Sequence, residues 1–146
     1  MSWDEHYLVL AKQMASRSKD PSTQTGAVIV GPDKRVVSMG FNGFPSKMPD
    51  NPEYYANREE KYSRIVHCEM NALLFAGKSV EGCTLYTWPF ISCDRCMVHM
   101  IQAGITRFVA PAPTAEQLTR WGPAFERTRR YAAECGVELV ELEISL

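Results

Sequence analysis

Two short segments of the chain restrict most strongly how it can fold: His67-Cys68-Glu69 and Cys93-Asp94-Arg95-Cys96. Each offers ligands that zinc prefers, an imidazole in the first segment and a pair of thiols in the second. The two segments are well separated along the chain, so a single ion held by both requires a fold that brings them together. We therefore expect most of the remaining sequence to act as a scaffold for this junction.

The number of ligands distinguishes a structural site from a catalytic one. Structural zinc sites use four protein ligands, whereas catalytic sites keep one position open. His99 cannot supply the fourth ligand, because on one helix it lies about 240° around the axis from Cys93. Cys68 is adjacent to His67, and adjacent helical residues do not face each other. The sequence thus predicts three ligands, His67, Cys93 and Cys96.

Glu69 is the acidic residue of the first segment. It lies two positions from His67, so it need not bind the ion that His67 holds. A water in the open position of a catalytic zinc site has a pKa of about 7. A carboxylate beside that water can take its proton and return it to a substrate. The segment therefore predicts hydrolysis at an electrophilic carbon.

These residues resemble the zinc-dependent nucleobase deaminases, whose signature is His-x-Glu followed by Pro-Cys-x-x-Cys. The resemblance implies that His67, Cys93 and Cys96 hold Zn²⁺ and that Glu69 is the catalytic acid and base. It also implies a three-layer α/β/α sandwich with a mixed five-stranded sheet, as in the cytidine deaminases. The expected reaction replaces the exocyclic amine of the base with oxygen and releases ammonia.

The chain departs from the family pattern at two positions. Cys68 stands where the family usually has Ala, and its backbone N–H is expected to bind the pyrimidine O2. Ser92 stands where the family usually has Pro, and we expect it to change the turn without abolishing the site.

Within this superfamily the chain is most similar to the deoxycytidylate deaminases, and the similarity runs nearly from end to end. The segments that carry it are Arg17 to Pro21, Gln24 to Ala27, Gly40 to Pro45, His67 to Ala72 and Ile101 to Ile105. The resemblance implies conversion of dCMP to dUMP for thymidylate synthesis, a homo-oligomer, and regulation by dCTP and dTTP. It also implies that Asn42 contacts the sugar and makes Lys19 a candidate for the phosphate. Asn42-Gly43 is also typical of a simple turn, and we favour the contact with the sugar because of the metal motif downstream.

Other functions stay open at this stage. One group comprises deaminases of tRNA adenosine, of free cytidine or of another cytosine nucleotide. The chain has 16 basic and 17 acidic residues, which disfavours a nucleic-acid substrate. Cytidine deaminases usually use a further Cys in place of the His ligand. A non-catalytic zinc-binding subunit is the remaining alternative, and the presence of Glu69 argues against it.

Length and composition are consistent with a single zinc-dependent domain over residues 1–146. Hydrophobic residues make up 45% of the chain, which is enough for a substantial core. No apolar run of about 18 residues and no signal-peptide pattern occurs, so we expect a cytoplasmic protein that contacts no membrane. The five cysteines form no paired framework. Those outside the metal site, Cys68, Cys83 and Cys135, are expected to be reduced.

Hydrophobic periodicity predicts alternating helices and strands. Helices are expected over 3–18, 67–77, 93–103 and 116–135, and strands over 25–30, 35–40, 83–88, 105–110 and 137–144. Both parts of the metal site then lie at helix N-termini on one side of the sheet. Residues 45–56 contain three prolines and no periodicity, and we expect a loop. The aromatic and basic residues at the end of this segment and directly after it are expected to approach His67 and to help hold a phosphate; they are Tyr54, Tyr55, Arg58, Lys61, Tyr62 and Arg64.

Overall fold

The computed structural model describes residues 1–146, and strand β1 (Gly26–Val30) is an inner strand of its sheet. All five residues of β1 are buried. Strand β1 pairs antiparallel with β2 (Val36–Phe41) and with β3 (Thr84–Trp88). Strands β4 (Arg107–Pro111) and β5 (Glu138–Leu142) continue the sheet in parallel, in the order β2-β1-β3-β4-β5. The predicted mixed five-stranded sheet is confirmed.

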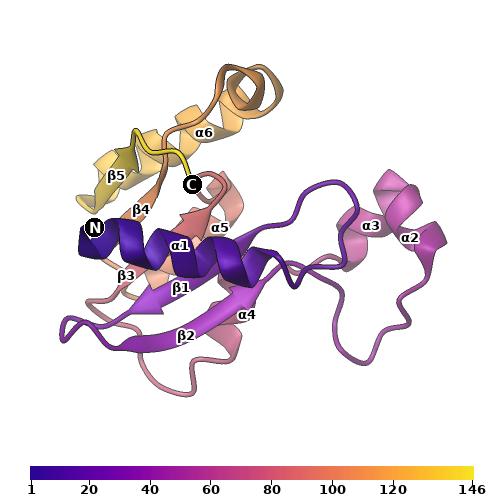
Figure 1. The fold of residues 1–146 in the computed structure, drawn as a ribbon, viewed down its shortest axis with the longest axis horizontal. Helices are drawn as coiled ribbons and strands as arrows, with labels where there is room; N and C mark the ends of the chain where they lie inside the picture. Colours follow the sequence, from indigo (N-terminus) through magenta and orange to yellow (C-terminus); the bar gives the residue numbers. More distant parts are fainter.

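Helices cover both faces of this sheet (Figure 1). Helix α1 (Trp3–Ala15) packs on one face, where Tyr7 and Leu8 share a buried cluster with Val28 and Val109. Helices α4 (Cys68–Leu74) and α5 (Asp94–Gln102) pack on the other face. Helix α6 (Ala115–Cys135) lies beside α5 on this second face. The three layers agree with the predicted α/β/α sandwich.

Two glycines allow the helices to lie close to the strands. A Cβ at Gly26 in β1 would lie 2.0 Å from the Ala11 carbonyl oxygen of α1. A Cβ at Gly40 in β2 would lie 2.5 Å from the Cys68 carbonyl oxygen and 2.6 Å from the Ala72 nitrogen of α4. All three distances are too short for a side chain at either position, so Gly40 sets how closely α4 approaches the sheet.

The segment 45–56, which we expected to be a loop throughout, ends in a short helix. Helix α2 (Pro52–Ala56) begins at Pro52, and the Asn51 side chain caps its N-terminus. Asn followed by Pro is a favourable start for a helix, because Pro has no N–H to leave unpaired in the first turn. Helix α3 (Arg58–Arg64) follows directly, and both helices lie at one end of the molecule (Figure 1).

The other element bounds differ from the predicted ones mainly at helix ends. Helix α1 ends at Ala15 and not at residue 18, and α4 ends at Leu74, before Gly77. Helix ends depend on capping contacts, which hydrophobic periodicity does not report. Every predicted strand is present within three residues of its expected bounds.

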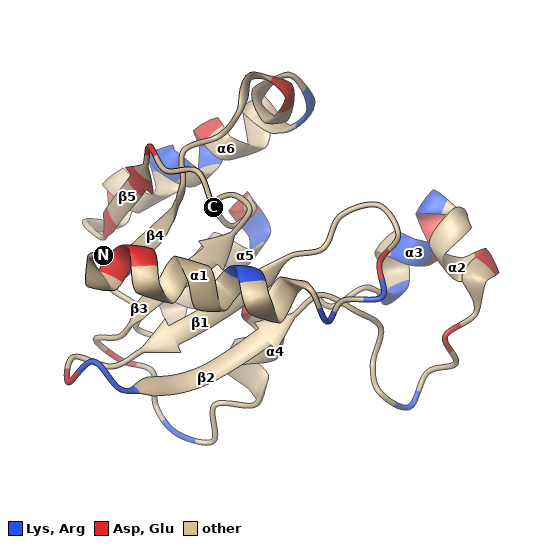
Figure 2. Ribbon diagram, viewed as in Figure 1, with Lys and Arg blue, Asp and Glu red and all other residues tan.

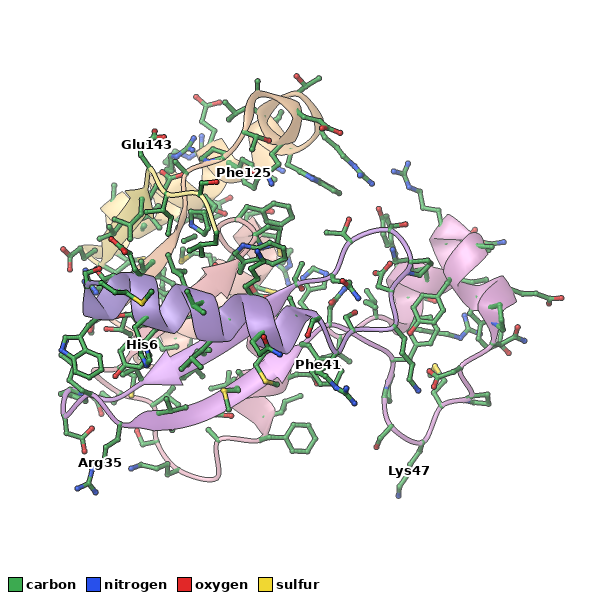
Figure 3. All side chains as sticks on the ribbon, in the orientation of Figure 1. His6, Arg35, Phe41, Lys47, Phe125 and Glu143 are labelled. Atoms are coloured by element: carbon green, nitrogen blue, oxygen red, sulfur yellow. The ribbon has the colours of Figure 1, made fainter.

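Charged residues of both signs are interspersed over α3 and α6 (Figure 2). Side chains such as Arg35 and Lys47 project from the surface loops, whereas Phe125 points from α6 into the interior (Figure 3). None of the helices combines the length and the apolar character needed to cross a membrane.

We expect Gly40→Ala to destabilise the protein and to weaken zinc binding, because the new methyl group pushes α4 away from β2. The free energy of unfolding should fall by about 1–3 kcal/mol. Gly122→Ala in α6 is the control, because a Cβ at Gly122 would have no neighbouring atom within 4 Å. Chemical denaturation with zinc quantification measures both effects. Equal stability of Gly40→Ala and the wild type would contradict this account of the contact.

Candidate active site

The three predicted metal ligands lie together in the structure. The His67 Nδ1 atom is 3.5 Å from the Cys93 Sγ and 3.3 Å from the Cys96 Sγ. All three ligand atoms lie within 4.8 Å of one another. Tetrahedral zinc, with bonds of about 2.0–2.3 Å, places such atoms roughly 3.5–3.8 Å apart. The donor set and its spacing therefore fit a zinc ion.

Local structure explains how these ligands converge. His67 is the N-cap of α4 and Cys93 is the N-cap of α5. The Cys93 Sγ also accepts a hydrogen bond from the Cys96 backbone N–H at 3.4 Å. The Cys-x-x-Cys spacing thus spans the first turn of α5 and brings both sulfurs to the same side. The predicted placement at helix N-termini on one side of the sheet is confirmed.

The residues excluded as ligands lie outside the cluster. His99 is exposed, and its Nδ1 atom lies 2.7 Å from the Arg95 carbonyl oxygen. The Cys68 thiol points to the Glu69 Oε1 atom at 3.6 Å. The cluster accordingly has three protein ligands.

Hydrogen bonds within the cluster set the protonation of the metal-free ligands. The Cys96 thiol, together with His67, lowers the pKa of Cys93 to about 4. The Cys93 thiolate in turn raises the pKa of His67 to about 9 and raises that of Cys96 above its usual range. At neutral pH the metal-free site is therefore one thiolate between an imidazolium and a thiol.

This protonation state predicts a pH dependence of zinc binding. Because zinc requires a neutral imidazole and two thiolates, binding at pH 7 should release about two protons, one each from His67 and Cys96. Apparent affinity should then fall as pH falls, by about 100-fold for each pH unit near neutrality. Chelator competition at pH 6, 7 and 8, and calorimetry in buffers of different ionisation enthalpy, measure these quantities. Cys135→Ser is the control, and a pH-independent affinity would contradict the prediction.

Glu69 is buried beside the ligands, with 4% of its surface exposed. The Ser92 hydroxyl donates a hydrogen bond to its Oε2 atom at 2.7 Å. The Oε1 atom faces the Cys68 thiol. Burial raises the pKa of Cys68 well above its usual value, so this group is a neutral thiol. The Oε1 atom of Glu69 therefore accepts no hydrogen bond from a strong donor.

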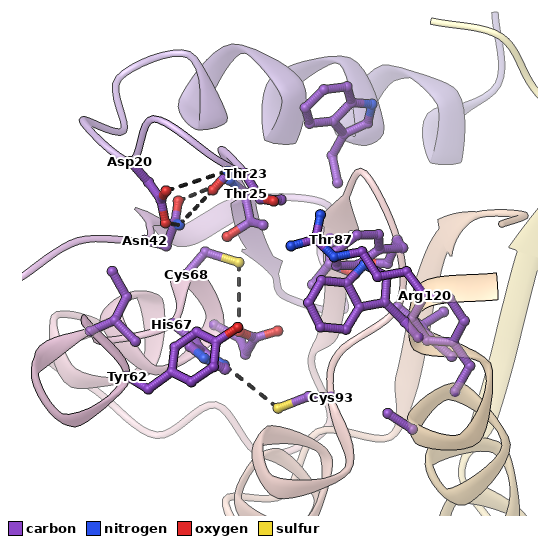
Figure 4. A pocket seen from close by; sticks show the side chains of 18 of the residues that line it. Asp20, Thr23, Thr25, Asn42, Tyr62, His67, Cys68, Thr87, Cys93 and Arg120 are labelled. Carbon is purple, nitrogen blue, oxygen red and sulfur yellow. Dashed lines mark hydrogen bonds between the residues drawn. The ribbon is translucent and has the colours of Figure 1, made fainter. Parts of the chain in front are cut away.

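A cavity of about 340 Å³ is lined by Glu69 and by the ligands His67 and Cys93 (Figure 4). Its volume lies at the small end of the range for ligand pockets, roughly 300–1,000 Å³. The wall combines aromatic and aliphatic side chains with a few polar ones. Besides His67, Cys68, Glu69 and Cys93, the lining residues are Asp20, Thr23, Thr25, Asn42, Lys61, Tyr62, Ile65, Thr87, Trp88, Phe90, Ile91, Arg120, Trp121, Ala124 and Phe125.

Asn42 lines this cavity, as its predicted contact with a ligand requires. Its Nδ2 atom donates to Asp20 at 3.2 Å and to the Thr23 carbonyl oxygen at 2.9 Å. Its Oδ1 atom accepts the Thr25 backbone N–H at 2.9 Å. Both amide hydrogens are used, so one lone pair of Oδ1 is what Asn42 can still offer.

Lys19 does not line the cavity. Its side chain is 70% exposed and forms an ion pair with Asp50. The segment that we expected to approach His67 contributes Lys61 and Tyr62 to the wall. The Lys61 ammonium is already paired with the Asp20 carboxylate at 2.9 Å.

Sequence reasoning missed one part of the wall. Arg120, Trp121 and Phe125 reach the cavity from α6, and Phe90 reaches it from the loop after β3. The Arg120 guanidinium lies 4.6 Å from the Trp121 ring centroid. None of the ion pairs in the structure includes Arg120. The spacing of Trp121 and Phe125 indicated a packed helix, but no spacing rule connects α6 with His67.

Comparison with known proteins decides the family. The model of the cytidine and deoxycytidylate deaminase zinc-binding region matches residues 1–112. The chain belongs to this family. A deaminase of Aliivibrio fischeri, described as uncharacterized and lying in the luxG 3′ region, is 38% identical over 99% of this chain and 96% of its own length.

Two further relatives carry a more specific name. The deoxycytidylate deaminases of Mus musculus and Homo sapiens are 35% and 34% identical over 75% of this chain. The matched part is 64% of each relative, so the similarity spans less than two thirds of those proteins. A dCMP deaminase from the cyanophage S-TIM5, solved in complex with dCMP and dUMP, has the same fold. It shares 21% identity at a TM-score of 0.73, over 94% of this chain and 95% of that one.

The family match covers the metal site but not the whole cavity. His67, Glu69, Cys93 and Cys96 all lie within residues 1–112. Helix α6 lies beyond that region, so Arg120 and Trp121 belong to a part of the chain that the family model does not describe.

Proposed function

We propose that this protein is a zinc-dependent deaminase that hydrolyses dCMP to dUMP and ammonia. The observation that carries the proposal is the Glu69 carboxylate, buried beside three zinc ligands at the base of a cavity. The similarity to deoxycytidylate deaminases supports dCMP as the substrate. The full-length similarity to the Aliivibrio fischeri deaminase supports the same reaction class.

The chemistry divides between the metal and the protein. Zinc held by three ligands supplies a water whose pKa is lowered to about 7. Glu69 takes a proton from the attacking water and delivers it to N3 of the cytosine ring. It then transfers the remaining proton of that water, now on the C4 hydroxyl, to the departing amine. A C4–O bond forms and the C4–N bond breaks, so water and dCMP give dUMP and ammonia.

The cavity wall can hold the base beside Glu69. The Cys68 backbone N–H is in the first turn of α4, where no carbonyl within the helix can accept it. We assign this N–H to the pyrimidine O2. The backbone N–H does not depend on the side chain, so Cys at this position in place of Ala is compatible with binding of the base. The remaining lone pair of the Asn42 Oδ1 atom is assigned to a hydroxyl of the sugar.

The phosphate requires a cation at the cavity that is not already neutralised. Lys61 is paired with Asp20, and Lys19 is paired with Asp50 outside the cavity. Arg120 lines the cavity and has no carboxylate partner. Arginine also binds phosphate through two parallel hydrogen bonds. We therefore assign the phosphate to Arg120 in preference to Lys19.

Exposed apolar side chains support the assembly that the family resemblance implies. Val36, Met39 and Phe41 are exposed on the edge strand β2, and Leu74 and Phe75 are exposed at the end of the adjacent α4. We propose that this surface lies in a homo-oligomer, that dCTP and dTTP regulate the enzyme, and that it acts in the cytoplasm. Sedimentation with and without each nucleotide tests the first two statements.

Glu69→Gln should retain zinc and lose turnover by about 10²–10⁴-fold, because the amide cannot carry the proton. The measurement is ammonia release by zinc-loaded protein offered dCMP, CMP, deoxycytidine and dCTP in parallel. Cys93→Ser is the matched comparison, and it should lose zinc and stability together. Turnover of none of the four substrates by the wild type would reject the proposed function. Turnover by Glu69→Gln at the wild-type rate would remove Glu69 from its role.

Arg120→Gln should raise the KM for dCMP by about 10- to 100-fold, the effect of one lost charge-assisted hydrogen-bond pair. The KM for deoxycytidine, which has no phosphate, should not change. Lys19→Gln tests the residue that the sequence suggested, and its kinetics should match the wild type. The reverse pattern, with Lys19→Gln impaired and Arg120→Gln normal, would move the phosphate site to Lys19.

A further inference from the structure

Ser92 is a buried residue held on two sides. Only 4% of its surface is exposed, and it lies in the loop between β3 and α5, next to the ligand Cys93. Its carbonyl oxygen accepts a hydrogen bond of 2.8 Å from the Thr128 hydroxyl of α6. Its own hydroxyl donates to the Glu69 Oε2 atom at 2.7 Å. The backbone contact fixes the loop, and the side-chain contact joins that loop to Glu69.

These contacts make the two carboxylate oxygens of Glu69 inequivalent. The Oε2 atom accepts a short O–H hydrogen bond, which is strong when the acceptor is a carboxylate. The Oε1 atom faces the Cys68 thiol at 3.6 Å, and a thiol is a weak donor. Cys68 is one of the residues that line the cavity, whereas Ser92 is not. Oε1 is thus the oxygen on the cavity side.

We propose that Ser92 is a positioning residue that fixes the rotamer of Glu69 and commits Oε1 to proton transfer. This inference rests on the proposed deaminase function. Glu69 has three rotatable side-chain bonds, and a buried carboxylate without a donor turns toward whichever donor is nearest. Because Pro has no hydroxyl, the proline expected from the family pattern at position 92 cannot make this contact. The contact is a feature of this chain.

Ser92→Ala tests the proposal in the zinc-loaded enzyme. We expect kcat for dCMP to fall about tenfold, with KM within about twofold of the wild type and zinc at full occupancy. Ser92→Thr keeps the hydroxyl and should recover most of kcat. Tyr7→Phe is the control for a lost hydroxyl on the opposite face of the sheet, and its kcat should not change. A crystal structure of zinc-loaded Ser92→Ala should show the Glu69 carboxylate displaced or divided between two rotamers.

Two results would overturn the proposal. One is a Ser92→Ala variant with wild-type kcat and an undisturbed Glu69 carboxylate. The other is a fall in kcat that is restored in full by resaturating the variant with zinc, which would assign Ser92 to metal retention. If the wild type fails to release ammonia from any cytosine substrate, the proposed function is rejected. The position of the Glu69 carboxylate in the Ser92→Ala crystal structure still decides the present inference in that case.

Discussion

The packing of α4 and α5 against one face of the sheet is the constraint on which the active site depends. Each helix carries part of the metal site at its N-terminus, His67 on α4 and Cys93 with Cys96 on α5. A shift of either helix would change the spacing of the ligand atoms. The buried cluster that contains Met97 and Met100 holds these helices in place, and Gly40 allows the close approach of α4. Core packing therefore sets the metal geometry.

A buried carboxylate is costly unless it is hydrogen-bonded, and Glu69 shows how the fold meets this requirement. Ser92 donates to one oxygen from the protein interior. The other oxygen is left on the cavity side with only a thiol nearby. Catalysis by proton transfer needs one carboxylate oxygen that is not fully hydrogen-bonded, because a fully hydrogen-bonded carboxylate has no free lone pair for the proton. One oxygen of Glu69 thus offsets the cost of burying the carboxylate, and the other is left to accept a proton.

The sequence predicted the parts of the site that depend on local spacing. His67-x-Glu69 and Cys93-x-x-Cys96 form single helical turns, so their geometry can be derived without tertiary structure. The Asn51-Pro52 start of α2 was a local signal, but it was obscured by the surrounding prolines. Arg120 could not be predicted, because its approach to the cavity follows from how α6 crosses α5. The hydrogen bond between Ser92 and Glu69 is likewise a tertiary contact, and position 92 was expected to affect only the turn.

Helix α6 connects the wall of the cavity with the loop that contacts Glu69. It supplies Arg120 and Trp121 to the cavity wall. Two turns further on, Thr128 holds the Ser92 carbonyl oxygen, and Arg127 pairs with Asp94 in the first turn of α5 at 3.1 Å. A ligand phosphate that draws Arg120 inward would therefore pull on the same helix that fixes Ser92 and the start of α5. Since α6 lies beyond the region that the family model describes, its contacts are where this chain can differ from its relatives without any change in the metal ligands.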